Sequence, residues 1–210
     1  MILLVVATAW LLSACTIGRG EVSATIYVAP VKGAPLVYLH PKDPERYRLA
    51  TVGVLPFQVP PNHGPTQGAA LAGLVRDVLL AKEVFPRVLQ LSEVYGGFAE
   101  AIALGRRAGV DLVLAGRLHR ALDATELGGA RAEMSIRLIN VETGNTVWHI
   151  AQAIDQPMDH HNVGAWRRIR ESFSPPVIRP SRGAPPLPNM LATIVADMAI
   201  VMTGTKVVPR

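Results

Sequence analysis

The sequence predicts an α/β (α+β) fold, in which two or three helices flank a mixed sheet of about five strands. Short apolar runs closed by Gly or Pro are typical of buried strands. An apolar stripe at helical spacing follows the first of these runs, and a strict alternation of apolar and polar residues marks a later strand. The predicted element order is therefore β-α-β-α-β-β-β-α.

The first half of the domain alternates strands with helices. Apolar runs at 51–57 and 88–91 predict the first two strands. A second helix, at about 98–108, carries two arginines in its last turn and is followed by Gly109 as a C-terminal cap. The first helix lies between these two strands. It has a continuous apolar stripe, formed by Leu71, Leu74, Val75, Val78 and Leu79.

The second half begins with three strands. Residues 110–118 predict the first of them, and Gly128-Gly129 predict the hairpin turn that follows. Residues 130–138 alternate between apolar and polar side chains, as a strand with one buried face does. A turn at 140–145 then leads into a strand that begins at 146–150.

A proline-rich excursion and a last helix end the chain. The excursion is expected at about 155–188, because six prolines between 175 and 188 are incompatible with a helix or an inner strand. The helix at 190–202 is apolar nearly all round and contains Asp197. Its length and its aspartate favour a core or docking helix over a membrane span.

Composition limits the class of protein. The 210 residues are 50% hydrophobic and 18% charged, which suits one domain with a buried core and excludes disorder for most of the chain. The single cysteine, Cys15, excludes a disulfide framework within a monomer and a multi-cysteine zinc site. The net charge of +5 is compatible with an anionic membrane or envelope partner and gives no argument for nucleic acid.

The N-terminal segment is apolar and uncharged over residues 1–14. At ~1.5 Å per residue it spans roughly 21 Å, which is short of a ~30 Å hydrocarbon core and suits the apolar part of a secretory signal. It ends in Leu12-Ser13-Ala14-Cys15, which resembles the lipobox of bacterial lipoproteins. The resemblance implies cleavage before Cys15 and lipidation of its sulfur, with acyl chains such as palmitate. A buried N-terminal helix with a chance cysteine is the alternative.

The lipobox sets the expected organisation of the chain. A signal peptide at 1–14 precedes a tether and N-terminal extension at 15–48, and a single periplasmic domain follows at 49–204. Thr16, rather than an aspartate, follows the cysteine. By resemblance to enterobacterial sorting rules, this favours the outer membrane.

Three segments of the domain together resemble a known family: 52–57, which ends in Pro-Phe, 107–116 with its Ala-Gly-Val-Asp, and 136–148 with its Thr-Gly and final Trp. They are similar to the periplasmic domain shared by CsgG-like curli-export lipoproteins, LpoB-type activators of peptidoglycan synthases and the N-terminal domain of TolB. The resemblance covers about 51–154 and the final helix. It implies an assembly, scaffold or channel-forming protein of the cell envelope, with no catalytic residue and no cofactor.

The predicted function is therefore a non-catalytic, membrane-anchored scaffold that binds envelope proteins, with copies of itself among the partners considered. A pore is disfavoured because charged side chains line the polar face of 130–138. One alternative is a metal-dependent hydrolase that uses Asp159-His160-His161, with His119 or His149 as a further ligand. Another is a module that binds peptidoglycan or another ligand.

A basic and aromatic segment, Trp166–Arg170, would suit contact with anionic lipid headgroups or an acidic partner. A solvated helix face is the alternative interpretation.

Overall fold

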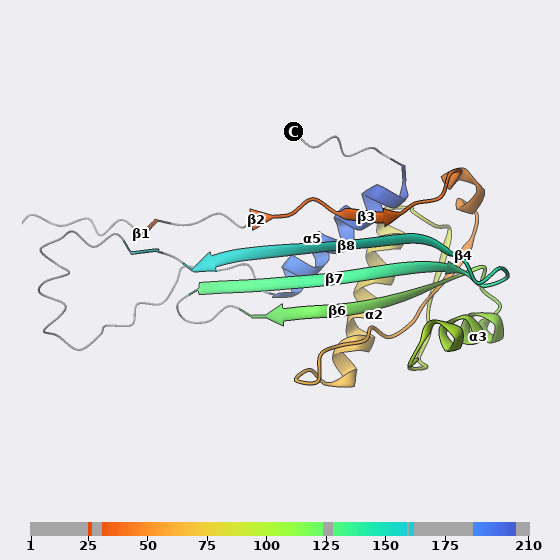
Figure 1. The fold of residues 1–210 in the computed structure, drawn as a ribbon, viewed down its shortest axis with the longest axis horizontal. Helices are drawn as coiled ribbons and strands as arrows, with labels where there is room; N and C mark the ends of the chain where they lie inside the picture. Colours follow the sequence, from red (N-terminus) through yellow and green to blue (C-terminus); the bar gives the residue numbers. More distant parts are fainter. Residues whose placement is uncertain (1–24, 27–30, 124–127, 159, 162–186, 205–210) are drawn as a thin grey trace, which may run out of the picture. The chain divides into compact units, whose positions relative to one another are not determined.

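The computed structural model describes residues 25–26, 31–123, 128–158, 160–161 and 187–204 (Figure 1). The chain divides into two units, one of Met1–Ile26 with His160–Pro176 and one of Tyr27–Asp159 with Val177–Arg210. In the first unit, β1 (Thr25–Ile26) pairs antiparallel with β9 (His160–His161). All other described elements belong to the second unit.

A mixed sheet of seven strands forms the centre of the second unit, in the order β2-β8-β7-β6-β4-β5, with β3 also paired to β8. β4 is parallel to β5 and β6, whereas β6, β7 and β8 form an antiparallel meander. The strands are β2 (Val31–Lys32), β3 (Leu36–Leu39), β4 (Thr51–Val54), β5 (Arg87–Gln90), β6 (Leu112–Leu122), β7 (Gly128–Asn140) and β8 (Thr146–Met158).

The sheet confirms the predicted α/β (α+β) class, and it has more strands than the five expected. The two additional strands, β2 and β3, come from the segment predicted as a tether, and both pair with β8. β8 itself continues to Met158, because β7 pairs with it as far as Gly128↔Met158. Strand pairing therefore includes the first residues of the predicted excursion at about 155–188, whereas 162–186 lie outside the described residues.

The described α-helices are α2 (Pro65–Ala81), α3 (Phe98–Ala108) and α5 (Leu187–Met202), and a short 3-10 helix, η2, covers Pro44–Tyr47. α3 ends as predicted at Gly109, whose φ of 64° is the left-handed conformation that glycine adopts without a Cβ penalty. None of the helices in the described ranges has the length and apolar character needed to cross a membrane.

The helices pack on the two faces of the sheet. α2 and α5 cover one face, where they meet the alternating apolar residues of β6, β7 and β8 in the larger core. α3 covers part of the other face, where Leu104 packs with Val113 and Ile139 in a smaller core. The even-numbered residues from Ala130 to Leu138 are buried in the larger core, as the alternation predicts.

Gly116 of β6 lets the chain segment after β4 lie close to the sheet. A Cβ at this position would overlap the buried ring of Phe57. The carbonyl of Gly116 accepts hydrogen bonds from the backbone N–H of Gln58 at 2.9 Å and from the phenol of Tyr95 at 2.9 Å. The glycine is therefore required by space and not by a positive φ.

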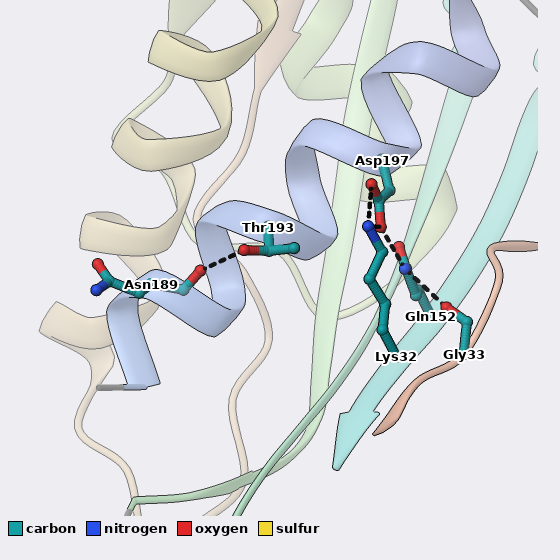
Figure 2. A network of polar contacts seen from close by, with 6 residues as sticks. All are labelled: Lys32, Gly33, Gln152, Asn189, Thr193 and Asp197. Carbon is teal, nitrogen blue, oxygen red and sulfur yellow. Dashed lines mark hydrogen bonds and ion pairs between the residues drawn. The ribbon is translucent and has the colours of Figure 1, made fainter. Parts of the chain in front are cut away.

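A polar network joins the N-terminal strand to the last helix (Figure 2). Asp197 of α5 accepts hydrogen bonds from Lys32 Nζ at 2.8 Å and from Gln152 Nε2 at 2.6 Å. Gln152 Nε2 also donates to the carbonyl of Gly33 at 2.9 Å. The aspartate in an otherwise apolar helix therefore connects β2, β8 and α5.

We expect Gly116→Ala to lower the free energy of unfolding by about 1–3 kcal/mol, because the added methyl group forces the Phe57 ring or the backbone to move. Urea unfolding followed by circular dichroism measures the change. Gly96→Ala is the control, since its Cβ would meet Glu100 Oε2 at an ordinary 3.5 Å. Equal unfolding midpoints for the two variants would contradict the packing argument.

We expect Asp197→Ala to lower the free energy of unfolding by about 1–3 kcal/mol, because it removes one of the two acceptors of the buried Gln152 amide, leaving only the carbonyl of Gly33. Asp197→Asn keeps an acceptor and loses only an ion pair with a half-exposed lysine, so it should cost about 1 kcal/mol or less. Thermal unfolding of both variants tests this order. Asp77→Ala, which removes an exposed ion pair with Arg76, is the control and should change stability least.

Candidate functional site

The two faces of the sheet are covered unequally. α2 and α5 pack along one face, whereas on the opposite face α3 packs against β6. Beyond α3, no helix in the described ranges packs on the outward side chains of β6, β7 and β8 (Figure 1). We call this region the open sheet face, and define it by Arg117, His119, Glu133, Ser135, Arg137, His149 and Ala151.

The strand register determines which side chains meet on the open sheet face. Arg117 pairs with Ser135, which pairs with Ala151 on the next strand. Two residues further along β7, Arg137 pairs with His149 of β8. Because alternate residues of a strand point to the same face, these five side chains all lie on the side of the sheet away from the larger core.

A hollow of about 480 Å³ lies over the open sheet face. Small residues, Ala115, Ser135 and Ala151, contribute to its lining between long polar side chains, and two aromatic residues, Tyr38 of β3 and Phe98 of α3, line it as well. The alternation of small and large side chains across three strands therefore produces a concave surface on what would otherwise be a flat sheet.

Two arginines of the open sheet face have neutral neighbours. Arg117 donates from Nε and Nη2 to Gln58 Oε1, at 2.9 Å and 2.6 Å. The guanidinium of Arg137 lies 4.8 Å from the centre of the Phe98 ring, in a cation–π contact. No carboxylate among the described residues forms an ion pair with either arginine.

Two histidines lie beside these arginines. His119 Nε2 is 2.8 Å from the hydroxyl of Ser135, and the ring of His149 stacks on Tyr38 with 4.6 Å between centroids. Burial lowers the pKa of His149, and its electrostatic interactions with Arg137 and His119 lower it further. His149 is therefore neutral at pH 7, because its surroundings disfavour the protonated, positively charged imidazole.

Tyr95 supports the α3 side of the hollow. Burial raises the pKa of its phenol to about 12, although the charge of Arg117 opposes the increase. The neutral phenol donates a hydrogen bond to the carbonyl of Gly116, and the carbonyl of Tyr95 accepts one from Gln58 Nε2 at 3.3 Å. Tyr95 thereby fixes Gln58, which in turn holds Arg117.

At the other end of the same face, two carboxylates share one arginine. Arg131 lies 3.9 Å from a carboxylate oxygen of Glu133 and 3.6 Å from one of Asp155. The region around Arg117 and Arg137 has no such internal partner in the described part of the chain. The face is therefore divided into an end where Arg131 is paired with carboxylates and an end where Arg117 and Arg137 are not.

Most residues that the sequence singled out for function lie elsewhere. The lipobox residues Leu12, Ser13, Ala14 and Cys15 lie outside the described residues, as do Asp159 and the segment 166–170. Their roles remain predictions.

The histidines predicted as metal ligands belong to two different units. His160 and His161 form β9 of the first unit, whereas His119 and His149 lie on the open sheet face of the second. Within the described ranges, no group of three or more His, Cys, Asp and Glu side chains is placed to hold a metal ion. A metal site that combines the two pairs of histidines stays a prediction.

Sequence reasoning did not identify the open sheet face as a site. The available signal was the polar half of the alternation in β7, where Arg137 and Ser135 share a face. The alternation predicts that this face is polar. It does not say whether a helix covers the face or which residues of β6 and β8 lie beside it.

Comparisons with known proteins identify a solved structure with the same fold. No family model matches the chain, and a search of curated proteins finds no match. Among solved structures, the chain is similar to the dodecamer of a point variant of PelC from Paraburkholderia phytofirmans, at 14% identity and a TM-score of 0.53, over 81% of this chain and 98% of that one.

Weaker similarities involve two further proteins. Lipoprotein GNA1162 from Neisseria meningitidis matches at 15% identity and a TM-score of 0.38, over 59% of this chain and 92% of that one. The LpoB C-terminal domain from Escherichia coli matches at 15% identity and a TM-score of 0.34, over 50% of this chain and 82% of that one. A relation to LpoB, CsgG-like proteins or TolB remains a prediction. The likeness to PelC shows that the chain shares a fold with that protein.

Proposed function

We propose that this protein is a non-catalytic, lipid-anchored scaffold of the bacterial cell envelope, attached through Cys15 to the periplasmic face of the outer membrane. The observation that carries the proposal is a lipobox, Leu12-Ser13-Ala14-Cys15, in front of a domain that has the fold of PelC. The lipobox supplies the means of attachment, and the fold supplies a precedent for assembly, because PelC is a dodecamer.

The length of the connecting segment supports a role close to the membrane. Residues 16–30 separate Cys15 from β2, and even a fully extended segment of that length reaches about 50 Å at most. More than one acyl chain on the cysteine would make attachment effectively permanent. The anchored domain would therefore stay within about 50 Å of the bilayer, where it meets other envelope proteins.

The edge strand β3 supports assembly from copies of this chain. All four residues of the strand are exposed, and among them Leu36 and Tyr38 are 61% and 62% exposed. β3 pairs with β8 on one side, and no strand in the described part of the chain pairs with its other side. An exposed apolar edge strand readily pairs with another chain. We assign this edge to contact with a second copy.

The lipid anchor is tested by mass spectrometry of the chain extracted from the membranes of a Gram-negative host. We expect a mature N-terminus at Cys15 that carries the mass of the acyl chains, because the lipobox directs cleavage in front of the cysteine. Cys15→Ser should abolish both lipidation and cleavage, while Ser13→Ala, which keeps a small side chain, should leave them intact. An unmodified Cys15 or an intact Met1 in the mature protein would refute the anchor.

Self-association is tested by sedimentation of the full chain in an uncharged detergent. We expect assemblies of several copies, and we expect Val37→Lys to weaken them by about tenfold, because a lysine on an edge strand opposes pairing with another strand. Leu49→Lys makes the same change at a residue that is 85% exposed and outside the sheet, and should leave the assemblies unchanged. The assignment to β3 fails if the wild-type chain sediments as a single copy, or if both variants behave alike.

A further inference from the structure

We propose that the open sheet face binds an extended acidic peptide segment of a partner protein, with carboxylates on two alternate residues held by Arg117 and Arg137. The proposal rests on the proposed scaffold function, and it deepens that function by naming the chemistry of the partner.

Charge supplies the first argument. Arg117 and Arg137 line one hollow, and their described neighbours there are an amide and an aromatic ring, neither of which neutralises a guanidinium. The same sheet neutralises Arg131 with Glu133 and Asp155 only a few residues away. Arg131 has carboxylate partners on this face, whereas Arg117 and Arg137 have none among the described residues, so these two arginines mark the place where an external anion would bind.

Spacing supplies the second argument. Arg117 is opposite Ser135, and Arg137 lies two residues further along β7, so the arginines are diagonal neighbours on one face. Diagonal neighbours are about 7–8 Å apart. In an extended peptide, alternate side chains point the same way and are about 6.7 Å apart. Arg137 can therefore receive one carboxylate in the bidentate geometry that arginine favours. Arg117 already donates from Nε and Nη2 to Gln58, so it would receive the second carboxylate through the remaining hydrogens of its two terminal nitrogens.

Shape supplies the third argument. The small side chains of Ala115 and Ala151 contribute to a hollow of about 480 Å³, which gives room for peptide side chains. Tyr38 and Phe98, which are 62% and 47% exposed, offer apolar contact for the residues between and beside the two acids. A peptide strand satisfies both the polar and the apolar parts of this lining.

The surroundings of His149 provide an internal reporter of the bound charge. The charged and titratable groups that face it are Arg137 of β7 and His119 of β6, and its ring stacks on Tyr38 of β3. Burial and the interactions with Arg137 and His119 hold its pKa below the usual value. A carboxylate that binds to Arg137 would offset the positive charge of the guanidinium, so the pKa of His149 would rise.

The binding test uses the full chain in an uncharged detergent and the peptide acetyl-Ala-Glu-Ala-Glu-Ala-amide, with the Gln-for-Glu peptide as the uncharged control. We expect Arg137→Gln to weaken binding by about tenfold or more, because it removes a charged hydrogen-bond partner. Arg107→Gln, at an exposed position in the last turn of α3, lowers the net charge equally and should leave the affinity unchanged. Circular dichroism confirms that each variant is folded.

The pKa of His149, followed by NMR, gives a second and independent result. We expect the Glu peptide to raise it in the wild-type chain and the Gln peptide to leave it unchanged. Arg137→Gln should raise it even without peptide, because a like charge is removed, and should then abolish the response to the Glu peptide. Arg137→Lys keeps the positive charge but lacks the planar guanidinium group. The pKa of His149 without peptide should therefore stay low, while binding of the Glu peptide weakens.

Three outcomes would overturn the proposal. Equal binding of the Glu and Gln peptides would remove the role of charge. Equal losses in Arg137→Gln and Arg107→Gln would indicate nonspecific attraction to a basic chain. Binding of a peptidoglycan muropeptide or of phosphatidylglycerol vesicles that depends on Arg137, without binding of the Glu peptide, would assign the face to a different partner. None of these outcomes alters the test of the lipid anchor or of self-association.

Discussion

The register of β6, β7 and β8 is the constraint on which the rest of the structure depends. These strands place one set of alternate residues in the larger core under α2 and α5, and the other set on the opposite face. A slip of one residue would exchange the two sets, and it would bury Arg137 while it exposed Leu138. Core packing therefore fixes the position of every side chain on the open sheet face, although none of those side chains belongs to the larger core.

The smaller core acts on the same strands from the other side. α3 packs on Val113 and Ile139, and its first residue, Phe98, lies against Arg137. Tyr95, just before α3, holds both Gln58 and the carbonyl of Gly116. The helix thus closes one end of the face and leaves the rest accessible. Phe98 of α3 therefore lines the hollow together with the small and large side chains of the strands.

Much of the fold could be predicted from the sequence, because its signals are local. The alternation in β7, the glycine after α3 and the apolar last helix each report on their own segment, and all three are confirmed. β2 and β3 were not predicted as part of the sheet, because their described residues are exposed and show no alternation. The site was not predicted because Arg117, Arg137 and His149 meet only through the register of three strands.

If the domain is attached to a membrane through Cys15, as proposed, the network around Asp197 would bear part of any force on the N-terminal segment. A pulling force on that segment would reach the second unit at β2, where Lys32 is bound to Asp197 and the carbonyl of Gly33 to Gln152, and also through β1, which pairs with β9 just after β8. The load would then pass directly to β8 and α5, which belong to the larger core. In the anchored state, these hydrogen bonds would resist the separation of β2 from β8 and α5.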